Sequence, residues 1–405
     1  MRQDLDRLMR EQKLAGLVVV ALDRYTAPMY YVTGQRIVHG IYLRGADGRA
    51  HLLHDAMERD QAVAVGCDHS SFAQHGYQKI QQEEGSPARV AGRLIGEACA
   101  TMGLGGRLGF FGDLGAGAAY EMIARAKQVH PAIEVADNYP DVITLARTTK
   151  SDDEIAAIRR ASNGVVGAWN QLLAYLGGLK RDGEHFVNGA GPVTLGDLRT
   201  RLHLEFTRAG LEGGESIVSQ GRDAGVPHNR GNDADLLTAG RPVIVDIFPG
   251  EAGGGYYSDF TRTICMGRAS DELRRMYGDV NDAFRLAMDT VKVGGACRSY
   301  QEAVCDLFEK RGHATLRTNA TAEEGYVHGL GHGVGLAVHE APRLGGPITN
   351  TTVLEPRMVI TIEPGLYYPS RGMGARIEDL VLVRPDGAME NLTPAPYTFE
   401  IEPRG

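Results

Sequence analysis

The strongest constraint on the fold is a pair of acidic strand hairpins in the second half of the chain. The apolar run VIV ends in Asp246, and Asp259 begins the run DFTRTICM after a glycine-rich turn. Farther along, MVITI ends in Glu363, and Glu378 comes just before the run LVLV. Short apolar runs bounded by Gly or Pro predict paired strands. A helical pattern over about 271–311 separates the hairpins, which indicates an internal duplication.

Each hairpin brings two carboxylates into apolar surroundings. Burying an ionised carboxylate without compensation costs several kcal/mol, so these acids should be protonated, ion-paired or bound to cations. Between the hairpins, EEGYVHGLGHGVGLAVHEAP offers His328, His332 and His339 among glycines that allow a close backbone approach. One imidazole with four carboxylates, two of them able to bridge, suits a pair of divalent ions such as Mn²⁺, Co²⁺, Fe²⁺ or Zn²⁺.

The first part of the chain predicts a separate α/β domain. Residues 2–13 predict a helix, and LAGLVVVAL, MYYVTG, GIYLRG and AHLLHD predict short strands. RVAGRLIGEACATMG predicts a further helix and GRLGFFGD a further strand. This part combines no acids and histidines into a cluster, so we assign it no chemistry.

The pattern changes near Thr148, where we expect the domain boundary. Ser151 is a good N-cap for a long helix, because Asp153 and Glu154 follow in its first turn. The glycine-rich segment 177–192 predicts a loop, and LGDLRTRLHLEFTRAG predicts a second helix after it.

Composition narrows the partners and the compartment. The 405 residues carry a formal net charge of −8 and no long basic block, which argues against a nucleic-acid or anionic-membrane binder. The charged start MRQDLDRLMREQK lacks the apolar core of a secretory signal, and the apolar run over 17–22 is too short to span a bilayer. Five cysteines without a CxxC pair indicate reduced thiols. We therefore expect a cytoplasmic protein without a membrane or nucleic-acid partner.

Five motifs, in chain order, resemble the pita-bread metallopeptidases. They are VDIFPG, SDFTRT, HGLGHGVGLAVHE, TIEPGLYY and RIED. Xaa-Pro aminopeptidases, prolidases (Xaa-Pro dipeptidases) and, more distantly, methionine aminopeptidases belong to this family, and the resemblance covers about 148–402. It implies an α/β (α+β) fold, with a creatinase-like domain over 1–147 and a pita-bread catalytic domain with pseudo-twofold duplication over 148–405. It also implies a homodimer.

The resemblance assigns a role to each motif residue. The resemblance implies five ligands for two divalent metal ions, of which Mn²⁺ is the first candidate. These ligands are Asp246, Asp259, His332, Glu363 and Glu378. Asp259 and Glu378 would bridge the metals. As residues beside the metals that act on the substrate, it implies His228 (in GVPHNRGN), His339 and His328. Glu363 would also accept a proton from the nucleophile.

Three further residues are candidates for substrate binding. Arg343 lies four residues after His339 and either binds a substrate carboxylate or is a solvated charge. Arg376 precedes Glu378 by two residues and could support that ligand as well. Tyr256, in the glycine-rich turn, is either a pocket wall or a packing residue.

The chain departs from the family pattern at several points. Asp246 and Asp259 are two residues farther apart than expected, and Phe248 and Arg357 stand where glycine is usual. We expect this longer turn and the long 177–192 loop to border the site. Both would then affect substrate preference more than metal binding.

The expected function is metal-dependent hydrolysis of short peptides, as an Xaa-Pro aminopeptidase or Xaa-Pro dipeptidase. A hydroxide that bridges the two metals would be the nucleophile. One alternative is a pita-bread peptidase with shifted specificity, either a non-proline dipeptidase or a carboxypeptidase-like enzyme. A creatinase-like hydrolase and a non-catalytic binding protein are further alternatives, and the intact ligand set argues against both.

Overall fold

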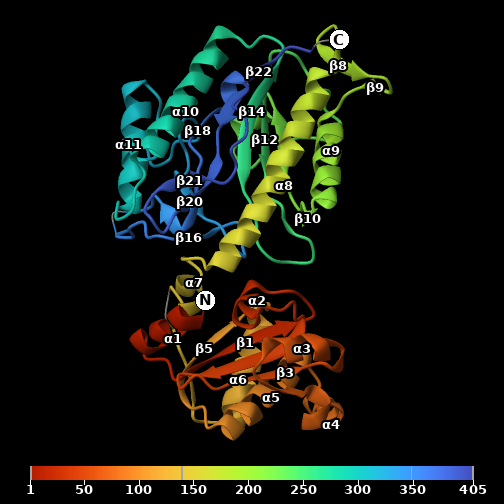
Figure 1. The fold of residues 1–405 in the computed structure, drawn as a ribbon, viewed down its shortest axis with the longest axis vertical. Coiled ribbons are helices and arrows are strands. Elements are labelled where there is room, and N and C mark those ends of the chain that lie inside the picture. The colour runs from red at the N-terminus through yellow and green to blue at the C-terminus, as the bar shows by residue number, and fades with distance from the viewer. Residues whose placement is uncertain (1, 138–139, 348, 404–405) are drawn as a thin grey trace. The chain divides into compact units, whose positions relative to one another are not determined.

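The chain forms two units, each with its own apolar core (Figure 1). The structure is a computed structural model that describes residues 2–137, 140–347 and 349–403. The N-terminal unit comprises Met1–Arg147 together with Gly253–Gly255, and the C-terminal unit comprises Thr148–Ala252 and Tyr256–Gly405. The tip of the glycine-rich turn is thus grouped with the N-terminal unit.

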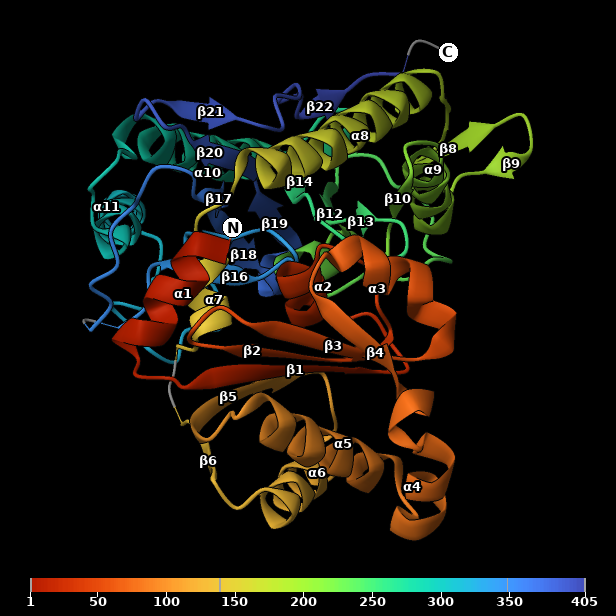
Figure 2. The same ribbon diagram turned by 60° about the horizontal axis from the view of Figure 1, so that its bottom comes forward.

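A six-stranded mixed sheet forms the centre of the N-terminal unit, in the order β4-β3-β2-β1-β5-β6. Its strands are β1 (Gly16–Leu22), β2 (His39–Gly45), β3 (Ala50–His54), β4 (Asp68–Ser71), β5 (Gly106–Gly112) and β6 (Ile133–Val135). Its helices are α1 (Arg2–Glu11), α2 (Ala27–Thr33), α3 (Arg59–Val65), α4 (Tyr77–Glu84), α5 (Pro87–Met102), α6 (Ala116–Val129) and α7 (Val142–Ala146). Figure 2 shows α5 and α6 on one face of the sheet and α1 and α2 on the other. Alternation along β1 directs Val18 and Val20 into the core with α5.

The predicted strand at MYYVTG is wrong, because these residues form most of α2. Local capping decides the outcome. Thr26 accepts a hydrogen bond from the Met29 backbone N–H at 3.3 Å, and Pro28 lies in the first turn. Gly34 ends the helix in the left-handed conformation, with a φ of 69°.

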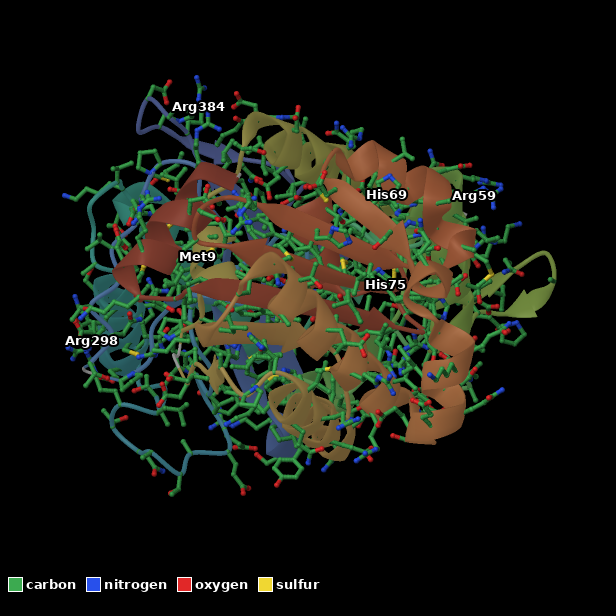
Figure 3. The ribbon with its side chains drawn as sticks, turned by 90° about the horizontal axis from the view of Figure 1, so that it is seen from below. Met9, Arg59, His69, His75, Arg298 and Arg384 are labelled. Carbon is green, nitrogen blue, oxygen red and sulfur yellow. The ribbon has the colours of Figure 1, made fainter. Side chains whose placement is uncertain are left out.

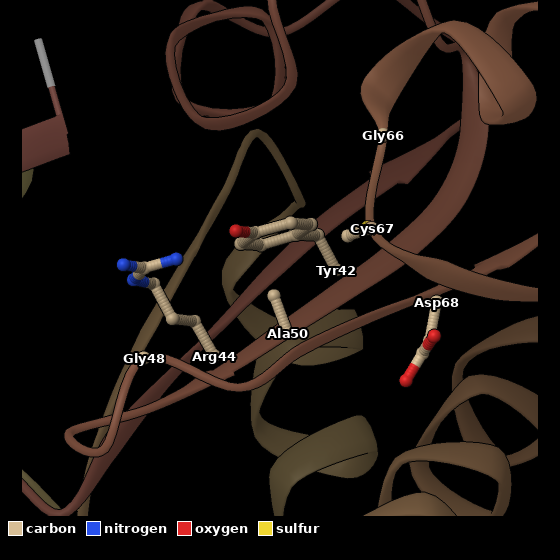
Figure 4. A pocket seen from close by; sticks show the side chains of 7 residues that line it. All are labelled: Tyr42, Arg44, Gly48, Ala50, Gly66, Cys67 and Asp68. Carbon is tan, nitrogen blue, oxygen red and sulfur yellow. The ribbon is translucent and has the colours of Figure 1, made fainter.

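The N-terminal unit holds a polar cavity and a group of histidines, each with its own internal partners. The cavity, of about 450 Å³, is lined by Tyr42, Arg44, Gly48, Ala50, Gly66, Cys67 and Asp68 (Figure 4). The Arg44 guanidinium in this cavity donates two hydrogen bonds to Asp6. Figure 3 labels two of the histidines, His69 and His75, and each hydrogen bonds within this unit, to His54 and Ser70 respectively.

The C-terminal unit repeats one arrangement, a strand hairpin covered by two helices. In the first half, α8 (Asp152–Gly177) and α9 (Leu195–Arg208) pack on β12 (Pro242–Ile247) and β14 (Phe260–Met266). In the second half, α10 (Asp271–Thr290) and α11 (Cys297–Lys310) share a core with β17 (Val359–Ile362) and β20 (Asp379–Val383). The predicted helices over 195–210 and 271–311 are confirmed, and Ser151 caps α8 in a capping box with Glu154.

Two larger sheets and two short strand pairs also belong to the described part of this unit. The sheet orders are β11-β12-β14-β22 and β16-β15-β17-β20-β21, with separate pairs β18-β19 and β10-β13. The strands not yet given are β10 (Leu211–Glu212), β11 (Ile217–Gln220), β13 (Gly250–Glu251), β15 (Gly331–Gly333), β16 (Glu340–Leu344), β18 (Gly365–Tyr368), β19 (Met373–Arg376), β21 (Met389–Asn391) and β22 (Glu400–Ile401).

The predicted 177–192 loop is instead a small antiparallel sheet. Its strands are β7 (Lys180–Asp182), β8 (His185–Asn188) and β9 (Gly191–Pro192), and buried Phe186 anchors it in the first-half core. His185 pairs with Thr238, which precedes the start of β12. Asp246 lies near the other end of β12, ~13 Å farther along at the usual strand rise. The expectation that this segment borders its own chain's site is therefore wrong.

The buried carboxylate of Glu84 predicts an acid-sensitive N-terminal unit. Hydrogen bonds from Arg125 lower the pKa of Glu84, and Arg89 lies 3.2 Å away. A lowered pKa stabilises the fold above the ordinary carboxyl pKa, and this stabilisation is lost as the pH falls through the lowered value. We expect Glu84→Gln to cost about 2 kcal/mol of unfolding free energy at pH 7 and less near pH 4. Urea unfolding of both proteins measures this difference, with exposed Glu11→Gln as the control. A deficit that does not shrink at low pH would contradict the assignment.

Candidate active site

The four hairpin acids lie at matching strand ends. Asp246 is the penultimate residue of β12, and Asp259 directly precedes β14. Glu363 directly follows β17, and Glu378 directly precedes β20. The antiparallel register of β17 and β20 pairs Ile362 with Asp379, so the two glutamates come next on the same ladder. Each hairpin therefore delivers its two carboxylates to one end.

The two hairpins meet directly at this end. Thr261 and Glu378 form an antiparallel bridge, in which the Glu378 backbone N–H donates to the Thr261 carbonyl at 3.0 Å. The Thr261 hydroxyl also donates to the Glu378 carboxylate at 2.6 Å. The seam between the two halves of the C-terminal unit thus runs through the acidic cluster.

His332 completes the cluster. Ligand atoms of Asp259, His332 and Glu378 all lie within 4.8 Å of one another, and all three residues are buried. The His332 Nε2 atom is 3.8 Å from Asp259 Oδ2 and 3.1 Å from Glu363 Oε1. The structure thus brings four of the five predicted ligands together around one imidazole nitrogen, and Asp246 connects to them through Arg376.

The orientation of His332 leaves Nε2 facing the acids. Its Nδ1 donates to the Gly333 carbonyl at 3.1 Å, and its backbone N–H donates to the Thr361 hydroxyl at 3.0 Å. A histidine ligand needs such a partner, because it fixes the tautomer. The neighbouring glycines are required sterically, since a Cβ at Gly331 or Gly333 would lie 2.1 or 2.0 Å from a backbone carbonyl oxygen.

Burial of so many acids shifts their pKa values in opposite directions. Burial raises the pKa of Asp246, and raises that of Asp259 and Glu378 well above the usual range. Burial also acts to raise the pKa of Glu363, but the hydrogen bond and charge of His332 outweigh it and lower that pKa to about 2. The His332 pKa rises to about 9, because Glu363 outweighs burial. Four carboxylates and one imidazole are a donor set that fits divalent ions of the Mn²⁺, Fe²⁺, Co²⁺ and Zn²⁺ group.

Three protein groups hold the guanidinium of Arg376. Its Nη2 donates to Asp246 at 2.5 Å, its Nε to Thr261 at 3.2 Å and its Nη1 to the Tyr367 hydroxyl at 2.6 Å. The Tyr367 hydroxyl also hydrogen bonds with His328 Nε2 at 2.8 Å. The guanidinium therefore positions Asp246, and its predicted contact with substrate stays a prediction. Sequence reasoning did not assign Tyr367, although it lies in the quoted motif GLYY.

The other predicted residues surround the cluster. The rings of His339 and His332 pack edge to face at 4.4 Å. Burial lowers the pKa of both His328 and His339, and the positive charge of a protonated His228 acts in the same direction on both. Arg343 faces His332 across β15 and β16 and is exposed.

The hydroxyl of Tyr256 contacts the long helix α8. Its side chain is buried, and its hydroxyl donates to Glu154 of α8 at 2.8 Å. This contact favours the packing alternative over the pocket wall.

A buried ion pair that sequence reasoning missed contacts the backbone of Glu378. Arg262 Nη2 donates to Asp379 at 2.7 Å, and both side chains are fully buried. Arg262 Nη1 donates to the Glu378 carbonyl at 2.8 Å, and the guanidinium stacks between the rings of Phe260 and Tyr397. A charged residue inside each of the apolar runs DFTRTICM and EDLVLV is the signal that could have revealed this pair.

Comparison with known proteins shows the family of this chain. Residues 156–385 match metallopeptidase family M24, and the chain belongs to this family. It is 32% identical to the probable dipeptidase PepE of Mycobacterium tuberculosis over 249 residues, which cover 62% of this chain and 60% of that protein. It is 34% identical over 174 residues to the Xaa-Pro dipeptidase of Pyrococcus furiosus, covering 43% of this chain and 46% of the relative.

Solved structures share the fold over nearly the whole chain. The Xaa-Pro dipeptidase from Bacillus anthracis superposes with a TM-score of 0.79, at 24% identity and 99% coverage of both chains. The X-Pro aminopeptidase from Thermotoga maritima gives a TM-score of 0.74 at 20% identity, again with 99% coverage of both. The predicted two-domain α/β fold of the pita-bread type is therefore confirmed.

Within the described ranges, no helix combines the length and apolarity needed to cross a bilayer.

Asp259→Asn tests the metal assignment. If Asp259 bridges two cations, as the family resemblance implies, a neutral amide is a poor substitute for its carboxylate, so we expect fewer than two metals per chain while the fold survives. Elemental analysis after dialysis measures occupancy, and circular dichroism checks the fold. The control is Asp386→Asn, which changes an exposed acid paired with Arg384. Two tightly held metals in the Asp259 variant would show that this residue does not bridge.

Proposed function

We propose that this protein is a dinuclear-metal-dependent peptidase of short peptides, an Xaa-Pro dipeptidase or Xaa-Pro aminopeptidase. The observation that carries the proposal is the convergence of Asp259, His332, Glu363 and Glu378 at the seam of the two hairpins, with Asp246 tied in by Arg376. Similarity to a probable dipeptidase and to an Xaa-Pro dipeptidase supports the substrate class.

The proposed ligands are the five residues that the sequence indicated, and Mn²⁺ is the first candidate metal. When bound, two such ions polarise a carbonyl group and supply a nucleophilic hydroxide near neutral pH. In this proposal, Glu363 takes up a proton in transit, and its carboxylate is held in place by the Thr361 hydroxyl at 3.1 Å and by His332. In this proposal, His339 and His228 hydrogen bond to the substrate carbonyl as it gains negative charge.

Tyr367 and Arg376 keep this pocket polar and rigid. Their chain of hydrogen bonds runs from His328 to Asp246, so a displacement of the histidine is opposed at a metal ligand. The intact acids argue against a creatinase-like reaction and against a purely binding role.

We further propose that the protein is cytoplasmic and forms a homodimer. Light scattering on the purified protein would test whether it is a dimer.

A peptide-library digest tests the function directly. Protein stripped with chelator, and then supplied with single metals, is incubated with a mixture of short peptides and read by mass spectrometry. The proposal requires metal-dependent cleavage at Xaa-Pro bonds. Full turnover in metal-free protein would reject it. Metal-dependent cleavage at other bonds would establish the alternative with shifted specificity, a non-proline dipeptidase or a carboxypeptidase-like enzyme.

Arg343→Ala distinguishes dipeptidase from aminopeptidase. Arg343 is exposed opposite His332, where its guanidinium could bind the free carboxylate of a dipeptide. If it does, the variant should raise KM for Ala-Pro about 10-fold or more and leave a tripeptide nearly unaffected. Steady-state kinetics on both peptides measures the difference, with exposed Arg384→Ala as the control. Equal changes for the two lengths would remove the dipeptidase version.

His228→Ala separates chemistry from assembly. Loss of a positioned hydrogen-bond donor or proton-transfer group should lower kcat by about 10²-fold and leave metal content intact. Turnover and elemental analysis are measured on the same sample, with His69→Ala of the N-terminal unit as the control. Loss of metal in the His228 variant would make this residue a ligand and overturn the set of five.

A further inference from the structure

A buried lysine and glutamate face each other in the C-terminal unit, outside the predicted ligand set. Lys150 Nζ lies 3.5 Å from Glu340 Oε2, and the side chains are 1% and 6% exposed. Lys150 Nζ also donates to the Thr148 carbonyl at 3.2 Å. Burying two such charges costs several kcal/mol per ion before their attraction is counted. Loss of either partner would remove an opposite charge from the buried surroundings of the other.

Glu340 closes the loop that presents His339. Its Oε1 accepts a hydrogen bond from the Ala337 backbone N–H at 2.9 Å, and the Gly335 N–H donates to the Ala337 carbonyl at 3.1 Å. The carboxylate also packs on the Gly335 backbone, where a Cβ would lie 2.6 Å from Glu340 Oε2. The carboxylate thus adds a side-chain contact to a turn over 335–340 that backbone hydrogen bonds also close, and His339 is the residue next to it.

The backbone of Lys150 contacts the residues just before β17, the strand that leads to Glu363. Thr149 pairs with Met358, and the Lys150 N–H donates to the Arg357 carbonyl at 2.9 Å. Arg357 returns a hydrogen bond to the Lys150 carbonyl at 3.1 Å and forms an ion pair with Asp152 at 2.8 Å. Arg357 has a φ of 73°, a conformation that favours glycine, and these side-chain contacts offset its strain. The lysine is thus anchored next to β17.

We propose that Lys150 and Glu340 form a positioning pair that holds His339 in its edge-to-face contact with His332. The inference deepens the proposed function and rests on the role given there to His339. Without the ammonium group, the buried carboxylate of Glu340 loses an opposite charge 3.5 Å away, its hydrogen bond to Ala337 weakens, and the turn over 335–340 opens more readily. His339 then loses its fixed place beside the metal ligands.

Charge-removing and charge-keeping variants test the pair. We expect Lys150→Met and Glu340→Gln each to lower kcat about 10-fold or more, with KM and metal content within about twofold, because a misplaced group affects the transition state most. Lys150→Arg keeps the charge and should recover kcat to within about threefold. The double variant, which removes both charges of the pair, should lose less than the product of the two single losses. Arg274→Met is the control, since it removes the ion pair to Glu400 elsewhere in the unit.

Hydrogen exchange read by mass spectrometry gives a second measure that does not depend on activity. Faster exchange of the segment 334–340 is expected in Lys150→Met and Glu340→Gln, and not in Arg274→Met. Unchanged exchange and unchanged kcat in a folded Lys150→Met protein would overturn the proposal. If the wild-type protein cleaves no peptide, the proposed function fails, and the exchange experiment still decides whether the pair holds the turn.

Discussion

The rest of the structure depends on the cost of placing four carboxylates close together, three of them buried and Glu363 largely so. Coulomb repulsion and burial both oppose ionisation there, so each acid needs positive charge nearby. Arg376 forms an ion pair with Asp246. His332 forms one with Glu363 and lowers the pKa of that carboxyl to about 2. The raised pKa values of Asp259 and Glu378 mark the places where positive charge is still needed. Divalent cations answer that need, and the donor atoms are those they prefer.

The scaffold behind the pocket keeps these charges in place. Arg262 contacts the backbone of Glu378, Asp379 receives the other edge of that guanidinium, and two aromatic rings enclose it. A network in which every buried polar group has partners is rigid, whereas a partly satisfied one would admit water or distort. The strand ends can therefore present their acids without relying on exposed loops. Loops contribute where contact with substrate is expected, at His228 and His339.

Much of the site could be predicted because its chemistry is written in short motifs. Strand alternation and apolar runs placed all four acids at strand ends, and helical periodicity found α8 to α11. Local capping at Thr26 overrode the strand-like MYYVTG, and the polar β7–β9 sheet lacks an apolar pattern that would reveal it. The Arg262–Asp379 pair was missed, because pairing between residues 117 positions apart is a property of the fold. The partner of Lys150 was hidden for the same reason.

The bridge between Thr261 and Glu378 makes the metal site a joint between two halves of the fold. Each half has a separate core, and the strands of the two hairpins meet where the ligands converge. A cation held by residues from both halves binds the native state and not the unfolded chain, so its binding free energy adds to the stability of this unit. Folding of the two halves is then coupled through the ligands. The supply of metal in the cell would set how long the protein survives proteolysis, as well as how fast it acts.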